Sequence, residues 1–149
     1  MQAAQAITLT RPIPPPKRVE GEPGSQGKPR VLVIDDLPEA RELCCAFLAF
    51  RGFGVSSAAD GQQGLAAARA TGPDAIVLDY SMPIMDGEEV ICHLKADART
   101  RAIPVVMLTA MPDLVDTLVR AACTAVLEKP CDPDTLVSTI AAALVDRTR

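Results

Sequence analysis

Polar and charged residues follow several short apolar runs of this sequence, each at the point where the run ends. Asp35 and Asp36 follow the first run, and Asp79 follows the third. Thr109 follows the fourth run, and Lys129 comes just after the fifth. An isolated aspartate is commonly a helix cap, an isolated threonine packs, and an isolated lysine is solvated. Here, however, such residues follow four of the apolar runs. This repeated placement indicates that they form one chemical site.

These residue types suit the metal-assisted transfer of a phosphoryl group. Three neighbouring carboxylates repel one another unless a cation lies between them, and Mg2+ prefers carboxylate and water oxygens. An Mg2+ ion that bridges Asp36, Asp79 and a phosphoryl oxygen would neutralise charge in the transition state. We therefore expect Asp79 to be the nucleophile. Thr109 would donate a hydrogen bond to one phosphoryl oxygen, and Lys129 would pair with another.

The elements that must position these residues follow a repeating pattern. From Arg30 onward, five apolar runs alternate with amphipathic stretches, a rhythm typical of a parallel sheet covered by helices on both faces. In such a sheet, ligand-binding residues gather beyond the carboxyl ends of the strands. The predicted strands are Val31–Ile34, Gly54–Ala58, Ala75–Leu78, Val105–Leu108 and Ala125–Leu127.

Two helices can be bounded from their turn signals. The first is expected from Pro38 to Phe50, ended by Gly52, with Leu43, Phe47 and Phe50 on its inward face. The last is expected over about 133–145. Its inward residues would be Leu136, Ile140, Ala143 and Leu144.

Length and composition favour one folded domain behind a tail. Residues 1–29 hold six of the 13 prolines and few large apolar residues, so we expect a disordered, proline-rich tail there and the folded domain over 30–149. The net charge of −4 argues against nucleic acid as a direct partner. No room is expected for a second domain in 149 residues.

The cysteines and the apolar segments indicate in which compartment the protein is expected to lie. The five cysteines are odd in number and never spaced C-x-x-C, so we expect reduced thiols rather than disulfides or a zinc site. Neither a signal peptide nor a run of eighteen apolar residues is present. We therefore expect a cytoplasmic protein without membrane contact.

Four motifs carry a family resemblance. They are the pair Asp35-Asp36, the stretch DYSMPIMDG that begins at Asp79, the pair Thr109-Ala110, and the pair Lys129-Pro130. With these motifs in this order, residues 30–149 resemble the receiver domain of bacterial two-component response regulators. The resemblance implies an α/β fold with a five-stranded parallel sheet, doubly wound in the flavodoxin-like (βα)5 arrangement.

The same resemblance implies a set of site residues. Mg2+ would be held by the carboxylates of Asp36 and Asp79 and by the backbone carbonyl of Ser81, with Asp35 contributing directly or through water. The Lys129–Pro130 peptide bond would be cis, which costs little before proline.

The function implied is signalling rather than enzyme catalysis. Asp79 would accept a phosphoryl group from a histidine kinase or a histidine phosphotransfer protein, and the phosphorylated chain would bind a downstream protein as a stand-alone monomer or weak dimer. Only Mg2+-dependent self-phosphorylation and self-dephosphorylation are expected. One alternative is a phosphorelay intermediate that passes the group on to a histidine phosphotransfer protein. A second alternative is a haloacid-dehalogenase-like phosphatase, but that family needs a D-x-D motif after the first strand, where this chain has adjacent aspartates. A third is a pseudo-receiver that is never phosphorylated, but such a protein would not need the site residues that this chain retains.

Two positions and the length of one segment depart from the family pattern. Val126 stands where receivers usually carry a tyrosine or phenylalanine that moves inward on phosphorylation. The span from Thr109 to Lys129 is about two residues shorter than is common, so the fourth helix is expected to be short or displaced. Cys131 replaces the aromatic residue that often follows Lys-Pro. These changes affect the expected output surface and leave the phosphorylation motifs intact.

Overall fold

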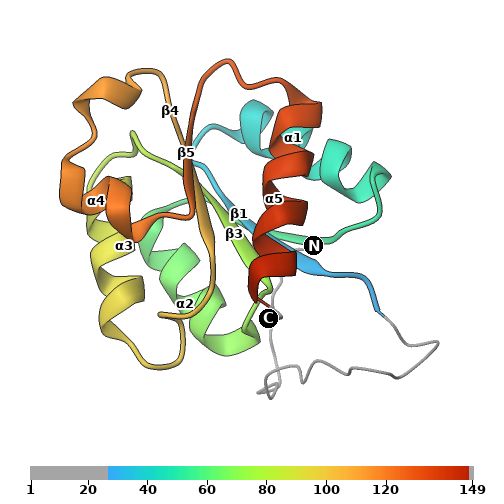
Figure 1. The fold of residues 1–149 in the computed structure, drawn as a ribbon, viewed down its shortest axis with the longest axis horizontal. Coiled ribbons are helices and arrows are strands. Elements are labelled where there is room, and N and C mark those ends of the chain that lie inside the picture. Colours follow the sequence, from blue (N-terminus) through green and yellow to red (C-terminus); the bar gives the residue numbers. More distant parts are fainter. Residues whose placement is uncertain (1–26, 148–149) are drawn as a thin grey trace.

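The computed structural model describes residues 27–147, and one parallel sheet of five strands lies at its centre (Figure 1). The strand order is β2-β1-β3-β4-β5, with helices on both faces, so the predicted doubly wound, flavodoxin-like sheet is confirmed. Most of the predicted tail, residues 1–26, lies outside the described residues. The strands are β1 (Arg30–Ile34), β2 (Gly54–Ala58), β3 (Ala75–Asp79), β4 (Val105–Thr109) and β5 (Ala125–Glu128).

The two faces of the sheet bury alternate residues of each strand. On β1, Leu32 and Ile34 face the core beneath α2 (Gly61–Thr71), α3 (Gly87–Ala96) and α4 (Thr117–Ala122). Val31 and Val33 of the same strand face the core beneath α1 (Pro38–Phe50) and α5 (Pro133–Arg147). A strand that is buried on both faces has a continuous run of apolar residues. This is why the β1 sequence RVLVI does not alternate between apolar and polar residues.

The predicted bounds of α1 are confirmed, but its predicted inward face is wrong. Leu48 is fully buried, whereas Leu43 is 73% exposed and Phe50 is 84% exposed. Every residue from 43 to 50 is apolar, so periodicity alone does not select which stripe of this helix packs on the sheet. The stripe that does so contains Cys44 and Leu48, one helical turn apart.

Helix α5 packs as its sequence predicts. Leu136, Ile140 and Ala143 are buried, and Leu144 packs against the same core. The helix continues two residues beyond the predicted end, to Arg147.

The caps of α2 and α3 fix two of the loops at the carboxyl edge of the sheet. The side chain of Asp60 accepts a hydrogen bond from the backbone nitrogen of Gln63 and so caps α2. Asp86 and Glu89 form a reciprocal capping box at the start of α3. Asp60 lies just after β2, and Asp86 closes the longer loop between β3 and α3, so both caps hold connections at this edge of the sheet in place.

The connection between β4 and β5 is compact. A 3-10 turn, η2 (Pro112–Leu114), precedes α4, which has only six residues. The expectation of a short fourth helix is therefore confirmed. Among residues 27–147, none of the helices combines the length and the apolar character that a membrane span requires.

Candidate functional site

The sequence-predicted residues lie at the carboxyl edge of the sheet, at the ends of four neighbouring strands. Asp35 and Asp36 directly follow β1, and Asp79 is the last residue of β3, the strand paired with β1. Thr109 ends β4, and Lys129 directly follows β5. The chain order reverses between β1 and β3, which is the point where an open α/β sheet forms its ligand crevice.

Three carboxylates meet at this crevice. One oxygen each from Asp35, Asp36 and Asp79 lies within 4.8 Å of the other two. Asp35 and Asp79 are buried, while Asp36 is half-buried and open to water. This set of hard oxygen donors, with solvent on one side, fits Mg2+, which keeps several waters when it binds carboxylates.

Lys129 supplies the cation closest to the predicted nucleophile. Its Nζ lies 2.6 Å from Oδ1 of Asp79. Burial raises the pKa of the Asp79 carboxyl above its ordinary value, whereas the Lys129 ammonium lowers it and the charges of Asp35 and Asp36 raise it. The Lys129–Pro130 bond is cis. The backbone nitrogen of Lys129 also donates to the carbonyl of Thr109 at 2.9 Å, which ties the loop after β5 to the end of β4.

The backbone around Asp35 is held by three hydrogen bonds. Its nitrogen donates to the carbonyl of Ala58 at 3.2 Å, and its carbonyl accepts from Arg41 at 2.9 Å. Its Oδ1 accepts from the nitrogen of Leu37 at 3.0 Å. One carboxylate oxygen of Asp35 is thus already engaged within the loop, while no such bond is found for the Asp36 side chain within the described region.

Thr109 ends β4, the strand paired with β3, and Ser81 lies in the loop that follows Asp79. Thr109 is buried, and its Oγ1 accepts a hydrogen bond from the nitrogen of Met111 at 3.0 Å. A hydroxyl that accepts one bond still has its own proton to donate. Ser81 is exposed in the loop after β3, two residues beyond Asp79. That loop returns to the sheet through the nitrogen of Gly87, which donates to the carbonyl of Tyr80 at 2.8 Å.

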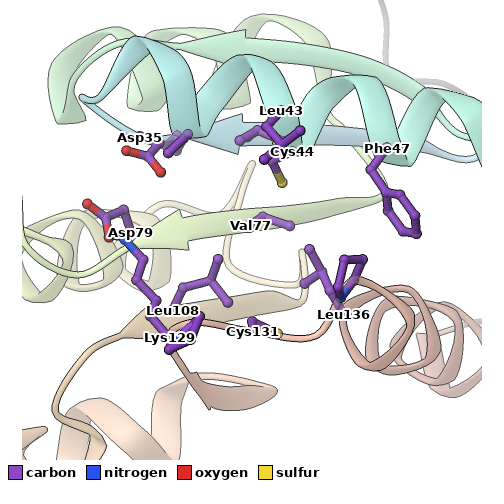
Figure 2. Close-up of a pocket in the computed structure, with 15 residues that line it drawn as sticks. Asp35, Leu43, Cys44, Phe47, Val77, Asp79, Leu108, Lys129, Cys131 and Leu136 are labelled. Carbon is purple, nitrogen blue, oxygen red and sulfur yellow. Dashed lines mark hydrogen bonds and ion pairs between the residues drawn. The ribbon is translucent and has the colours of Figure 1, made fainter.

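An apolar cavity of about 490 Å³ opens beside the carboxylates, between α1 and α5 (Figure 2). Leu43 and Cys44 of α1 line it on one side, and Leu136 of α5 lines it on the other. Asp79 and Lys129 lie at one end. Sequence reasoning missed this cavity, although Cys131 in place of an aromatic residue was the available signal. We name this hollow the α1/α5 cavity.

Comparison with known proteins gives one family. Residues 31–141 match the model of the response regulator receiver domain. The chain is 37% identical over 118 residues to the DNA-binding dual master transcriptional regulator RpaA of Synechocystis, covering 78% of this chain and 49% of that protein. It is 36% identical to Protein PilH of Pseudomonas aeruginosa over 117 residues, covering 77% of this chain and 97% of PilH. The chain thus spans about half the length of its DNA-binding relatives and nearly all of PilH.

A solved structure matches the same region. The receiver domain of sensor histidine kinase PA1611 from Pseudomonas aeruginosa PAO1 superposes with a TM-score of 0.73 at 27% identity, covering 79% of this chain and 98% of that domain. That domain was crystallised with a magnesium ion coordinated in its active site cleft.

Proposed function

We propose that this chain, which belongs to the response regulator receiver family, accepts a phosphoryl group on Asp79 from a phosphorylated histidine of a partner protein. Receiver domains are signalling domains of two-component systems rather than classical enzymes. The single observation that carries the assignment is the meeting of three carboxylates within 4.8 Å of one another, with the ammonium of Lys129 on Asp79.

In the proposed reaction, one carboxylate oxygen of Asp79 forms a bond to phosphorus. The bond from phosphorus to the donor imidazole nitrogen breaks, and its electron pair stays on that nitrogen. Lys129 already contacts Asp79 and would follow the developing charge onto a phosphoryl oxygen. Thr109 would donate its hydroxyl proton to a second oxygen. Positioning and electrostatics of this kind supply most of the catalysis in phosphoryl transfer.

We also propose that the site binds Mg2+. Asp36 and Asp79 would hold the ion, with the backbone carbonyl of Ser81 as a further oxygen and Asp35 contributing directly or through water. When bound, Mg2+ would neutralise the charge that gathers on the phosphoryl oxygens. Support comes from the hard oxygen donors of the cluster and from the magnesium ion reported for the PA1611 receiver domain.

The proposed output is a phosphorylation-dependent interaction with a downstream protein, made by the chain as a stand-alone regulator. Support comes from PilH, of which the match covers 97%. Self-phosphorylation by small donors and slow self-dephosphorylation are expected of the same site.

Intact-mass spectrometry tests the proposal. With acetyl phosphate and Mg2+, the wild-type chain should gain the mass of one phosphoryl group, and Asp79→Asn should gain none. Asp113→Asn is the matched control, because Asp113 is an exposed aspartate of η2 outside the carboxylate cluster. Retention of the adduct in Asp79→Asn would show that another residue is the acceptor.

A further inference from the structure

The outer face of α1 lacks the charged residues that a surface helix normally carries along its length. Every residue from 43 to 50 is apolar. Leu43 is 73% exposed, Phe50 is 84% exposed, and Ala46 and Ala49 are exposed as well. A helical segment that is apolar all round is normally covered on every side. We name these four exposed residues the α1 outer patch and ask what covers it.

The α1 outer patch has a spacing that suits an extended segment. Leu43 and Phe50 lie on the same side of the helix, two turns and about 10 Å apart along its axis. Ala46 lies between them, so only a methyl group separates the two large side chains. A segment that carries apolar groups about 10 Å apart on one side would therefore cross Ala46 and pack against both Leu43 and Phe50.

The Phe50 end of the patch lies away from the carboxylate cluster. Helix α1 begins just after Asp36, and Phe50 is its last residue. Figure 2 shows Asp79 and Phe47 at opposite ends of the α1/α5 cavity, and Phe50 follows Phe47 by almost one helical turn. Whatever covers Phe50 can do so without reaching the proposed phosphorylation site.

The N-terminal tail joins the folded domain beside this end of α1. The carbonyl of Pro29 accepts a hydrogen bond from the backbone nitrogen of Gly54 at 2.8 Å, and Gly54 follows Phe50 by only four residues. Residues 1–26, which precede this point, lie outside the described part of the chain. The tail is therefore tethered next to the patch.

The tail contains a segment that matches the patch. Its sequence RPIPPPKR, at residues 11–18, places Ile13 and Pro16 three positions apart. Prolines and the residues before them favour the polyproline II conformation, in which positions i and i+3 face the same side about 9 Å apart. Segments of this kind bind to exposed aromatic side chains in proteins.

Chain length and charge are compatible with this contact. Twelve residues lie between Pro16 and Pro29, and an extended chain covers up to about 3.3 Å per residue, whereas α1 is about 20 Å long. Residues 1–29 hold four basic and two acidic residues, while the whole chain has 15 basic and 19 acidic ones. On α1, Glu39 and Glu42 are exposed, and neither is in an ion pair within residues 27–147.

We propose that residues 13–16 of the tail bind across the α1 outer patch in a polyproline conformation. Ile13 packs against Phe50 and Pro16 against Leu43, which places the basic pair Lys17-Arg18 beside Glu39 and Glu42. Because the segment is tethered to the same chain, its effective concentration at α1 is high, and a contact too weak to hold a separate peptide is occupied. The inference is independent of the proposed phosphorylation of Asp79.

Solution NMR of the full chain tests the contact. The chain has three phenylalanines, one tyrosine and no tryptophan, so the aromatic signals are few and separable. We expect nuclear Overhauser effects between the methyl protons of Ile13 and the ring protons of Phe50. Because the contact is intramolecular, they should persist when the protein is diluted about tenfold.

Variants on both partners locate the contact. Phe50→Ser should abolish these effects and return the signals of residues 13–16 to those of a synthetic peptide of residues 1–26. Leu118→Ser is the matched control, because Leu118 is a 79% exposed leucine on α4, and it should leave the contact intact. The double variant Ile13→Ser/Pro16→Ser should shift the amide signals of residues 43–50, and it decides the question if Phe50→Ser does not fold.

The charge pairing has its own variant. Glu42→Lys should weaken docking by about two- to fivefold, the effect of one exposed ion pair. Asp113→Lys reverses an exposed charge on η2 and should have no effect on docking.

Three results would overturn the inference. Signals of residues 13–16 that coincide with those of the free peptide would show that the tail does not dock. Contacts at Phe50 that vanish on dilution would assign the patch to a second copy of the chain. Phe50→Ser should be labelled by acetyl phosphate at the wild-type rate, and a large loss would place the patch in the phosphorylation site. If the wild-type chain is not labelled at all, the proposed function is wrong, while the NMR result still decides whether the tail docks.

Discussion

At the scale of single residues, the position of Asp79 combines two opposing demands. As the proposed nucleophile for phosphoryl transfer, Asp79 must be ionised, yet it is only 4% exposed and lies beside two further carboxylates. Lys129 offsets part of this cost through its 2.6 Å contact. The outcome is a carboxyl whose pKa stays above its ordinary value. The ionised Asp79 carboxylate therefore destabilises the folded state, and a cation bound at this site would reduce that destabilisation.

The raised pKa of Asp79 predicts that Asp79→Asn is more stable than the wild type near neutral pH without Mg2+. A carboxyl whose folded pKa lies above its unfolded value favours the folded state when protonated, so it destabilises the fold once the pH exceeds both values. The amide removes this penalty, and we expect the melting temperature to rise by a few degrees at pH 7. The difference should shrink as the pH falls through the pKa of Asp79.

Calorimetry across pH 3.5–7.5 provides the measurement, with Asp113→Asn as the exposed control. A melting temperature for Asp79→Asn that is equal to or below the wild-type value at pH 7 would contradict the argument.

At the scale of elements, the sequence predicts strands better than it predicts helix faces. β1, β3 and β4 are short apolar runs followed or ended by a polar residue, and the bounds of all five strands agree with the prediction to within one residue. Helix α1 is different, because apolar residues surround it and only tertiary packing decides that Leu48 turns inward and Leu43 outward. Cys131 was a sequence signal for the α1/α5 cavity, but the extent of the cavity could not be predicted, since it depends on how α1 and α5 are spaced above the sheet.

The start of α3 presses closely on the end of β3, and Gly87 is the residue that permits it. A Cβ at Gly87 would lie 2.8 Å from the Cα of Tyr80 and 3.0 Å from the carbonyl oxygen of Asp79. Backbone atoms cannot move aside as a side-chain end can. Gly87→Ala is therefore expected to lower the free energy of unfolding by about 1–3 kcal/mol, the usual cost of overpacking.

Gly54→Ala is the matched control for Gly87→Ala, because its Cβ would meet only ordinary contacts at 3.6 Å or more. Because the added Cβ presses on the backbone of Asp79 and Tyr80, Gly87→Ala should also slow labelling by acetyl phosphate. Urea unfolding and labelling rates measure both effects, and equal stabilities of the two variants would show that the loop adapts freely.

At the scale of the whole molecule, the backbone pairing of the sheet reaches the last residue of the predicted tail. The carbonyl of Pro29 accepts a hydrogen bond from Gly54 at 2.8 Å, which extends the pairing of β1 with β2 by one residue. The carboxylate cluster was predictable because parallel strands bring their carboxyl ends to one edge whatever the loops do. The interactions of Thr109 with Met111 and of Lys129 with Asp79 depend on side-chain geometry that spacing does not specify.

The loop between β4 and α4 is where the signal is expected to leave the site. Thr109 Oγ1 now accepts from Met111, so a phosphoryl group that draws this hydroxyl inward must break or lengthen that bond. Met111 and Leu114 are exposed, and Arg120 of α4 donates to the carbonyl of Pro112. Movement of Thr109 would therefore reach η2 and α4 through the backbone of this loop.

Val126 is expected to limit the structural response of β5 and α5 to phosphorylation. It is only partly buried against the core beneath α4, and it has no ring to fill space that Thr109 vacates. A ligand shifts a conformational equilibrium only by its differential interaction with the two states. We therefore expect beryllofluoride, a phosphoryl mimic, with Mg2+ to cause large amide NMR shift changes at residues 109–114 and small ones across β5 and α5. In Val126→Tyr, a ring is restored and the changes should spread into β5. Large changes over 125–143 of the wild type, with residues 109–114 unmoved, would mean that the signal leaves through β5 and α5 without a ring.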